Sequence, residues 1–221
     1  MLFITDKENK VVFGWSAKCG CTHVKNMFWY LKENIENHNL HIQCEYEKLP
    51  DDVENYTVIV FIRNPYERLV SGFLNTGIWL YNWKEPTTTF TKFVNELMAH
   101  TWEQIDRHHF TPQTSEFYHH DLLSKSKKLI LYDIKNIDYE NIEKIYNKKI
   151  PQSVRDFKGD HYQKTTTLME KPVYDLELNE YKEYKVPTRF FYSQDIQSKV
   201  YHFYNYDFRY FKEHGFDYSL N

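Results

Sequence analysis

Two apolar runs, each followed by a polar loop and a helix-like pattern, constrain the fold of this 221-residue chain more than any other feature. The run 56–62, Tyr-Thr-Val-Ile-Val-Phe-Ile, is rich in β-branched and aromatic residues and does not alternate. Such a run is typical of a strand that is covered on both faces. Arg63, Asn64 and Pro65 end it, and Pro65 suits the first turn of a helix that runs to Phe73.

The second run, 11–15, leads through the polar loop 16–22 into 23–33, where apolar residues recur at helical spacing. A third strand is predicted over 129–132, with a helix near 139–147. Strands that alternate with helices predict an α/β fold. We expect a central parallel sheet with helices on both faces and a phosphate-binding loop, like a P-loop, after the first strand.

The remaining segments support one continuous domain over residues 1–221. The segment 150–172 is polar and threonine-rich, which predicts a long loop. The segment 194–211 places aromatic residues at helical spacing and predicts one helix that packs on the core. We find no internal repeat and no linker rich in proline, glycine or serine.

The charge balance excludes some classes of protein. The chain has 28 basic and 31 acidic side chains, whereas a protein that binds nucleic acid through phosphates usually has a basic excess.

No apolar run reaches the roughly 18 residues of a membrane span, and the N-terminal segment is charged. The three cysteines, Cys19, Cys21 and Cys44, form neither a disulfide scaffold nor a metal-ligand pattern. We therefore expect a cytoplasmic protein with no nucleic-acid partner, no membrane span and no metal.

The loop 14–22, Gly-Trp-Ser-Ala-Lys-Cys-Gly-Cys-Thr, is the first candidate site. Backbone N–H groups of such a loop and the N-terminus of the next helix favour an anion. Lys18 adds a full charge and Thr22 a hydroxyl group. A kinase-type phosphate loop needs the lysine directly after its second glycine, but Lys18 precedes Gly20, so the ATP or GTP pattern does not match. A plain strand–turn–helix remains the alternative.

Arg63 and Ser71 form the second candidate site. Arg63 comes at the carboxyl end of a buried strand, where open α/β sheets bind their ligands, and Ser71 follows two helical turns later. A guanidinium group and a hydroxyl group suit a phosphate monoester, although Arg63 could instead cap the helix or pair with Glu67. Two anion sites on neighbouring strand ends indicate a nucleotide with phosphates at both ends of its ribose.

These motifs resemble those of the sulfotransferase family. The segment Lys18-x-Gly-Cys-Thr is similar to its 5′-phosphosulfate loop, although Ala17 stands where most members have proline. The segment 61–73, Phe-Ile-Arg-Asn-Pro-Tyr-Glu-Arg-Leu-Val-Ser-Gly-Phe, resembles its 3′-phosphate motif. The resemblance is greatest to the carbohydrate branch with the chondroitin, dermatan 4-O- and heparan 2-O-sulfotransferases. Weaker similarities are His109-Phe-Thr-Pro-Gln, the stretch 161–166 and the aromatic segment 204–211.

The resemblance implies transfer of a sulfuryl group from 3′-phosphoadenosine 5′-phosphosulfate (PAPS) to a hydroxyl group, with adenosine 3′,5′-bisphosphate (PAP) as product. A carbohydrate is the favoured acceptor, and protein tyrosine or a small alcohol is the alternative. Lys18 would contact the bridging oxygen. A cradle for the 5′-phosphate would consist of Gly20, Cys21 and Thr22. Arg63 and Ser71 would hold the 3′-phosphate. Lys164 and Thr165 would form a lid over the nucleotide. No metal is required.

The general base on the acceptor remains open. The motif around His109 makes it the first candidate, and His41 is the second because the heparan 2-O branch places its base ahead of the strand that carries Arg63. His108, Asp106 and Glu45 are further alternatives. Two other functions stay open for the whole chain: a non-catalytic protein that binds a nucleotide or a glycan, and a nucleotide kinase of the phosphate-loop class.

Overall fold

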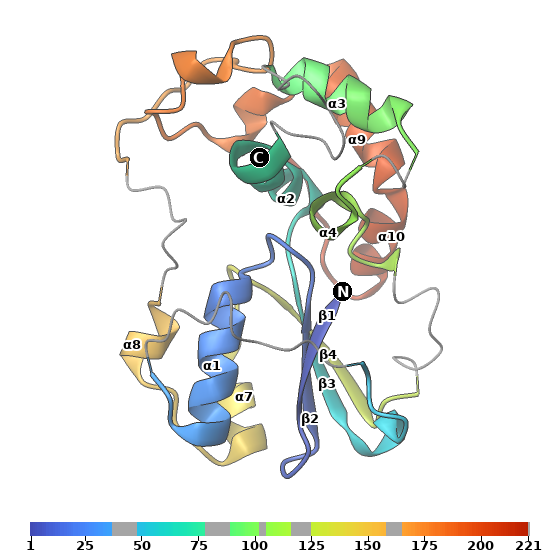
Figure 1. Ribbon diagram of the computed structural model, residues 1–221, viewed down its shortest axis with the longest axis vertical. Helices are drawn as coiled ribbons and strands as arrows, with labels where there is room; N and C mark the ends of the chain where they lie inside the picture. Colours follow the sequence, from blue (N-terminus) through green and yellow to red (C-terminus); the bar gives the residue numbers. More distant parts are fainter. Residues whose placement is uncertain (37–47, 78–88, 102–104, 116–124, 158–164, 221) are drawn as a thin grey trace. The chain divides into compact units, whose positions relative to one another are not determined.

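A computed structural model describes residues 1–36, 48–77, 89–101, 105–115, 125–157 and 165–220 (Figure 1). The chain forms two compact units. The sheet unit comprises Met1–Arg63 and Gln113–Tyr162, and the helical unit comprises Asn64–Pro112 and Gln163–Asn221. A single domain over 1–221 stays a prediction.

The described residues of the sheet unit contain four strands in the order β1-β2-β3-β4, namely β1 (Leu2–Asp6), β2 (Val11–Trp15), β3 (Thr57–Ile62) and β4 (Lys128–Asp133). β2 pairs with β3 and β3 with β4 in parallel, whereas β1 pairs with β2 antiparallel. The predicted α/β fold with a central parallel sheet is confirmed for β2, β3 and β4, and the antiparallel β1 makes the whole sheet mostly parallel. The three strands expected from the sequence are β2, β3 and β4.

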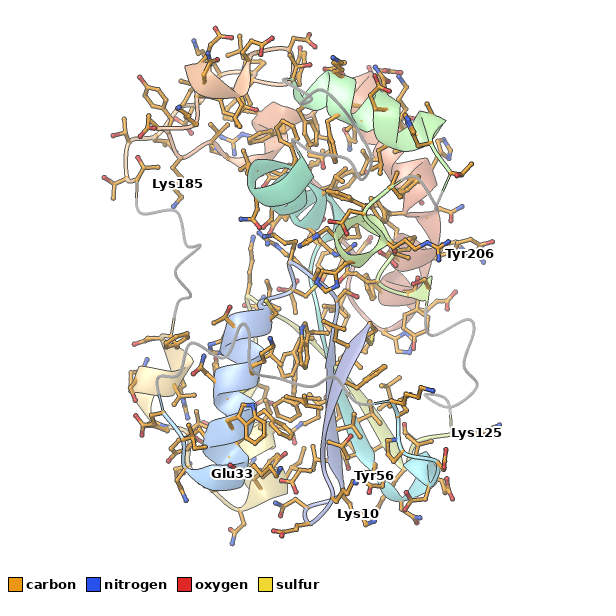
Figure 2. All side chains as sticks on the ribbon, in the orientation of Figure 1. Lys10, Glu33, Tyr56, Lys125, Lys185 and Tyr206 are labelled. Atoms are coloured by element: carbon orange, nitrogen blue, oxygen red, sulfur yellow. The ribbon has the colours of Figure 1, made fainter. Side chains whose placement is uncertain are left out.

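β1 was not predicted, so the candidate phosphate loop follows the second strand and not the first. The Asp6 carboxylate accepts hydrogen bonds from the N–H groups of Glu8 and Asn9, both at 3.1 Å, which closes a tight hairpin between β1 and β2. Lys10 ends this hairpin with a φ of 54°. Its Nζ lies 3.3 Å from the Tyr56 hydroxyl, and Figure 2 labels both residues there.

Among the described residues, the helices α1 (Cys21–Glu33), α7 (Tyr139–Tyr146) and α8 (Gln152–Arg155) lie on one side of the sheet (Figure 1). A short 3₁₀ turn, η1 (Val53–Asn55), precedes β3. Phe13 of β2 packs on Phe28 of α1, with ring centroids 5.4 Å apart. Helix α8 lies inside the segment that we expected to be a loop, and it adds the buried Val154 to the core.

In the part of the helical unit that the structure describes, eight short elements lie around an aromatic core (Figure 1). They are α2 (Pro65–Gly72), which continues into the π-helical turn η2 (Phe73–Gly77), then α3 (Phe90–Ala99), α4 (Arg107–Phe110), the 3₁₀ turns η3 (Leu178–Glu180) and η4 (Thr188–Phe191), α9 (Gln194–Phe203) and α10 (Asn205–Glu213). The prediction of a single helix over 194–211 was wrong, because the segment is interrupted at Tyr204. The buried Tyr204 hydroxyl donates to the carbonyl of Phe110 at 2.8 Å.

Glu143 of α7 stabilises the sheet unit through an ion cluster, and this gives the first testable prediction. Its side chain is only 4% exposed and accepts from Lys149 at 2.8 Å and from Arg155 at 2.6 Å. The N–H of Ile150, then Lys149 and Arg155, lower the pKa of Glu143 to about 2. A carboxyl group with a depressed pKa stabilises the fold above its unfolded pKa, and this stabilisation is lost as the pH falls through the folded value.

We expect Glu143→Gln to lower the melting temperature by several degrees near neutral pH, because Arg155 and the Ile150 N–H lose their charged acceptor. The difference from wild type should shrink as the pH falls from about 4.5 toward 2. Glu140→Gln, an exposed change on the same helix, is the control. Thermal melts of the three proteins across pH measure this, and a difference that does not depend on pH would contradict it.

Candidate functional site

The loop between β2 and α1 has a left-handed backbone at two positions. Lys18 has a φ of 67° and Gly20 a φ of 70°, while the Cys19 N–H donates to the Ser16 carbonyl at 3.1 Å. Glycine adopts this region readily, but a lysine there is strained, and such strain concentrates at functional sites. Gly20 is also the N-cap of α1, and its carbonyl accepts from the Val24 N–H at 3.0 Å. The loop therefore turns directly into the helix.

The first turn of α1 is suited to an anion. Among the described residues, no side chain caps this end of the helix, and the first turn contains no acidic residue. The first N–H groups of a helix have no partner within the helix, and they lie at the positive end of its dipole. Gly20, Cys21 and Thr22 are each partly exposed here. The predicted 5′-phosphate cradle is thus accessible and electrostatically positive.

Arg63 brings a second positive charge to this loop. It follows β3 directly, and its Nη1 donates to the Lys18 carbonyl at 3.1 Å. Burial lowers the pKa of the Lys18 ammonium, and the charge of Arg63 lowers it further, while Cys21 opposes the shift. Two neighbouring cations repel each other, and an anion bound between them would remove this repulsion. The structure therefore brings together Lys18, Arg63 and the N-terminus of α1.

Gln113 connects Arg63 to the same loop, and sequence analysis assigned it no role. Its Oε1 accepts from the Arg63 N–H at 3.0 Å and from the Cys19 thiol at 3.0 Å. Its Nε2 donates to the Arg63 carbonyl at 2.8 Å. Gln113 lies 50 residues from Arg63 in the chain, so no local pattern in the sequence could indicate this contact.

His109 belongs to the helical unit and has a carboxylate partner. It lies in α4, whose N-cap is Asp106, and its Nδ1 is 2.5 Å from Asp106 Oδ2. Burial opposes ionisation of Asp106, but the hydrogen bond and the charge of His109 outweigh it and lower the pKa of that carboxyl. An Nδ1–H that donates to a carboxylate leaves Nε2 as the proton acceptor of the ring. Ser71 also lies in the helical unit, partly exposed in α2.

The other predicted site residues are only partly described. The Thr165 hydroxyl donates to the Glu183 carbonyl at 2.8 Å. Lys164, His41 and Glu45 lie outside the described residues. Within the described ranges, no three or more histidine, cysteine, aspartate or glutamate side chains are placed to hold a metal ion. No helix in those ranges has the length and apolar character to cross a membrane.

The fold and the loop together define an α/β protein with a loop suited to an anion at the carboxyl end of a parallel strand. The family model described as "Sulfotransferase family" matches residues 1–216, so this chain belongs to the sulfotransferase family. No curated protein and no solved structure shows a significant match to the chain. Family membership supports sulfuryl transfer in general, and the donor, the acceptor and the individual site residues are proposed below.

Proposed function

We propose that this protein transfers a sulfuryl group from PAPS to a hydroxyl group of a carbohydrate. The observation that carries the proposal is the pair of cations, Lys18 and Arg63, beside the N-terminus of α1, which no described side chain caps. Such a group of positive charges suits a nucleotide with a phosphosulfate and a separate 3′-phosphate. Membership of the sulfotransferase family supports this assignment over a phosphate-loop kinase.

The donor supplies an S–O bond to its 5′-phosphate that breaks as a new S–O bond forms to the acceptor oxygen. Lys18 stabilises the negative charge that develops on the leaving phosphate, and the N–H groups near Gly20, Cys21 and Thr22 hold that phosphate. Nε2 of His109 takes the proton of the acceptor hydroxyl, while Asp106 keeps the imidazole oriented. PAP is then the nucleotide product.

Arg63 and Ser71 bind the 3′-phosphate in this proposal, and Lys164 and Thr165 contribute to a cover over the nucleotide. A forked guanidinium group is well matched to a terminal phosphate, which ATP lacks at that position. Charge stabilisation by Lys18 and the helix terminus serves the role that a metal ion has in many phosphoryl-transfer enzymes.

A titration with PAP beside ATP and ADP tests the donor site. Saturation at about 100 times the dissociation constant should stabilise the protein by about 2.7 kcal/mol, which raises the melting temperature by several degrees. Arg63→Ala should weaken PAP binding more than tenfold, because a hydrogen bond to a charged group contributes about 1.5–3 kcal/mol. Calorimetric titration of both proteins measures the affinities.

Arg189→Ala, which removes an exposed arginine of the helical unit, is the control and should leave PAP affinity unchanged. A preference for ATP over PAP would favour the kinase and contradict the proposal. PAP binding without PAP formation from PAPS, in the presence of any acceptor tested, would indicate a non-catalytic nucleotide-binding protein. The acceptors to test are unsulfated chondroitin and heparan oligosaccharides, a tyrosine peptide and a small alcohol.

A further inference from the structure

The side chain of Gln113 makes three hydrogen bonds to two segments of the candidate site. Its amide pairs with both main-chain groups of Arg63, at 3.0 Å to the N–H and 2.8 Å to the carbonyl. The same Oε1 accepts from the Cys19 thiol at 3.0 Å. Gln113 is 1% exposed and Cys19 is fully buried, so water does not compete for these contacts.

These contacts form a closed ring of bonds that joins the segments carrying the two cations, Lys18 and Arg63. Arg63 Nη1 donates to the Lys18 carbonyl at 3.1 Å, and Lys18 is bonded covalently to Cys19, which donates to Gln113. Gln113 in turn holds the backbone of Arg63. The ring therefore fixes the residue proposed to bind the 3′-phosphate relative to the loop proposed to bind the 5′-phosphate. A buried amide that loses its partners costs free energy, so the ring has one favoured arrangement.

We propose that Gln113 is a positioning residue that sets the nucleotide selectivity of this site. It holds Arg63 at a fixed distance from the Lys18 loop, so that a ligand with phosphates at both the 3′ and 5′ positions engages both cations. A ligand with a 5′-phosphate alone needs only the loop and gains nothing from this spacing. The inference rests on the proposed PAPS site, and it assigns Gln113 a role that acts through Arg63.

The test compares two probes, PAP and adenosine 5′-monophosphate (AMP), which differ only in the 3′-phosphate. Selectivity is the dissociation constant of AMP divided by that of PAP, measured by calorimetric titration. We expect Gln113→Met, which keeps the volume and removes the amide, to lower this ratio about tenfold or more, equivalent to about 1.4 kcal/mol. Gln113→Asn, whose amide is one methylene shorter and cannot span both partners, should lower it in the same direction and serves if the methionine variant does not fold.

A purely structural role would change both affinities by the same factor and leave the ratio constant, and that result would overturn the inference. In an Arg63→Ala background, Gln113→Met should change the ratio less than about twofold, because its effect passes through Arg63. Gln152→Met, at an exposed glutamine of α8, is the matched control. Wild-type protein that does not prefer PAP to AMP would overturn the donor site itself. A preference that survives in the Gln113 variants would overturn only the role of Gln113.

Discussion

Lys18→Met is expected to reduce the formation of PAP from PAPS about a thousandfold. Removal of one group that stabilises developing charge in an active site typically costs about 10²–10³ in turnover, and a full positive charge belongs at the upper end. Methionine is one atom shorter than lysine but keeps most of its apolar stem. Both residues have a Cβ, so the left-handed backbone at this position is equally strained in both proteins. The substitution therefore removes the charge and leaves the loop conformation in place.

The measurement is the initial rate of PAP release at saturating PAPS, with an unsulfated chondroitin or heparan oligosaccharide as acceptor. Lys32→Ala, at an exposed lysine in the last turn of α1, controls for the loss of one positive charge from the same unit. Binding of PAP to Lys18→Met should weaken far less than turnover falls, because the charge matters most as the S–O bond breaks. A loss of turnover below tenfold would contradict the role assigned to Lys18.

The parts of the fold that could be predicted are those in which neighbouring residues carry the signal. β3 and β4 are apolar runs that end at breakers, and α2 begins at Pro65, where the sequence indicates a helix start. Helix α7 has Asp138 as an N-cap that accepts from the Asn141 N–H, and its predicted bounds agree within one residue. In each case, local chemistry and burial favour the same structure.

The parts that were missed depend on pairing and contacts that no pattern of neighbouring residues signals. The strand β1 has only five residues, and its place in the sheet comes from pairing with β2 through the Asp6 turn. No proline or glycine marks the break between α9 and α10 at Tyr204. The break instead accompanies a hydrogen bond from the Tyr204 hydroxyl to Phe110, 94 residues earlier in the chain. Helical periodicity continues across the break and gives no sign of it.

The candidate site shows the same division. Lys18, Gly20, Cys21 and Thr22 are adjacent in the sequence, so their loop could be recognised directly, and the parallel pairing of β2 with β3 brings Arg63 to it. Gln113 could not be assigned, because its partners become neighbours only after the chain folds.

The second large effect is expected at His109. General acid–base catalysis contributes about 10²–10⁴ in rate, so His109→Ala should lower turnover by at least about a hundredfold near neutral pH. PAP affinity should not change, because the proposed role of His109 concerns the acceptor hydroxyl and not the nucleotide. Asp106→Asn should cause a smaller loss of turnover, since an amide oxygen can still accept from Nδ1–H but no longer stabilises the protonated ring. Turnover with the oligosaccharide acceptor and calorimetric titration with PAP measure the two quantities separately.

His108→Ala is the control for this prediction. His108 is the exposed neighbour of His109 in α4, and the centroids of the two imidazole rings are 4.7 Å apart. His108→Ala should retain most of the activity. If the loss in His109→Ala came from a general disturbance of α4, turnover would fall in both variants. The Asp106 contact distinguishes a base from a surface histidine, since a carboxylate at 2.5 Å from Nδ1 fixes the orientation in which Nε2 can accept a proton. If His109→Ala remains active and His41→Ala does not, the base is the earlier histidine, and the contact with Asp106 serves only to cap α4.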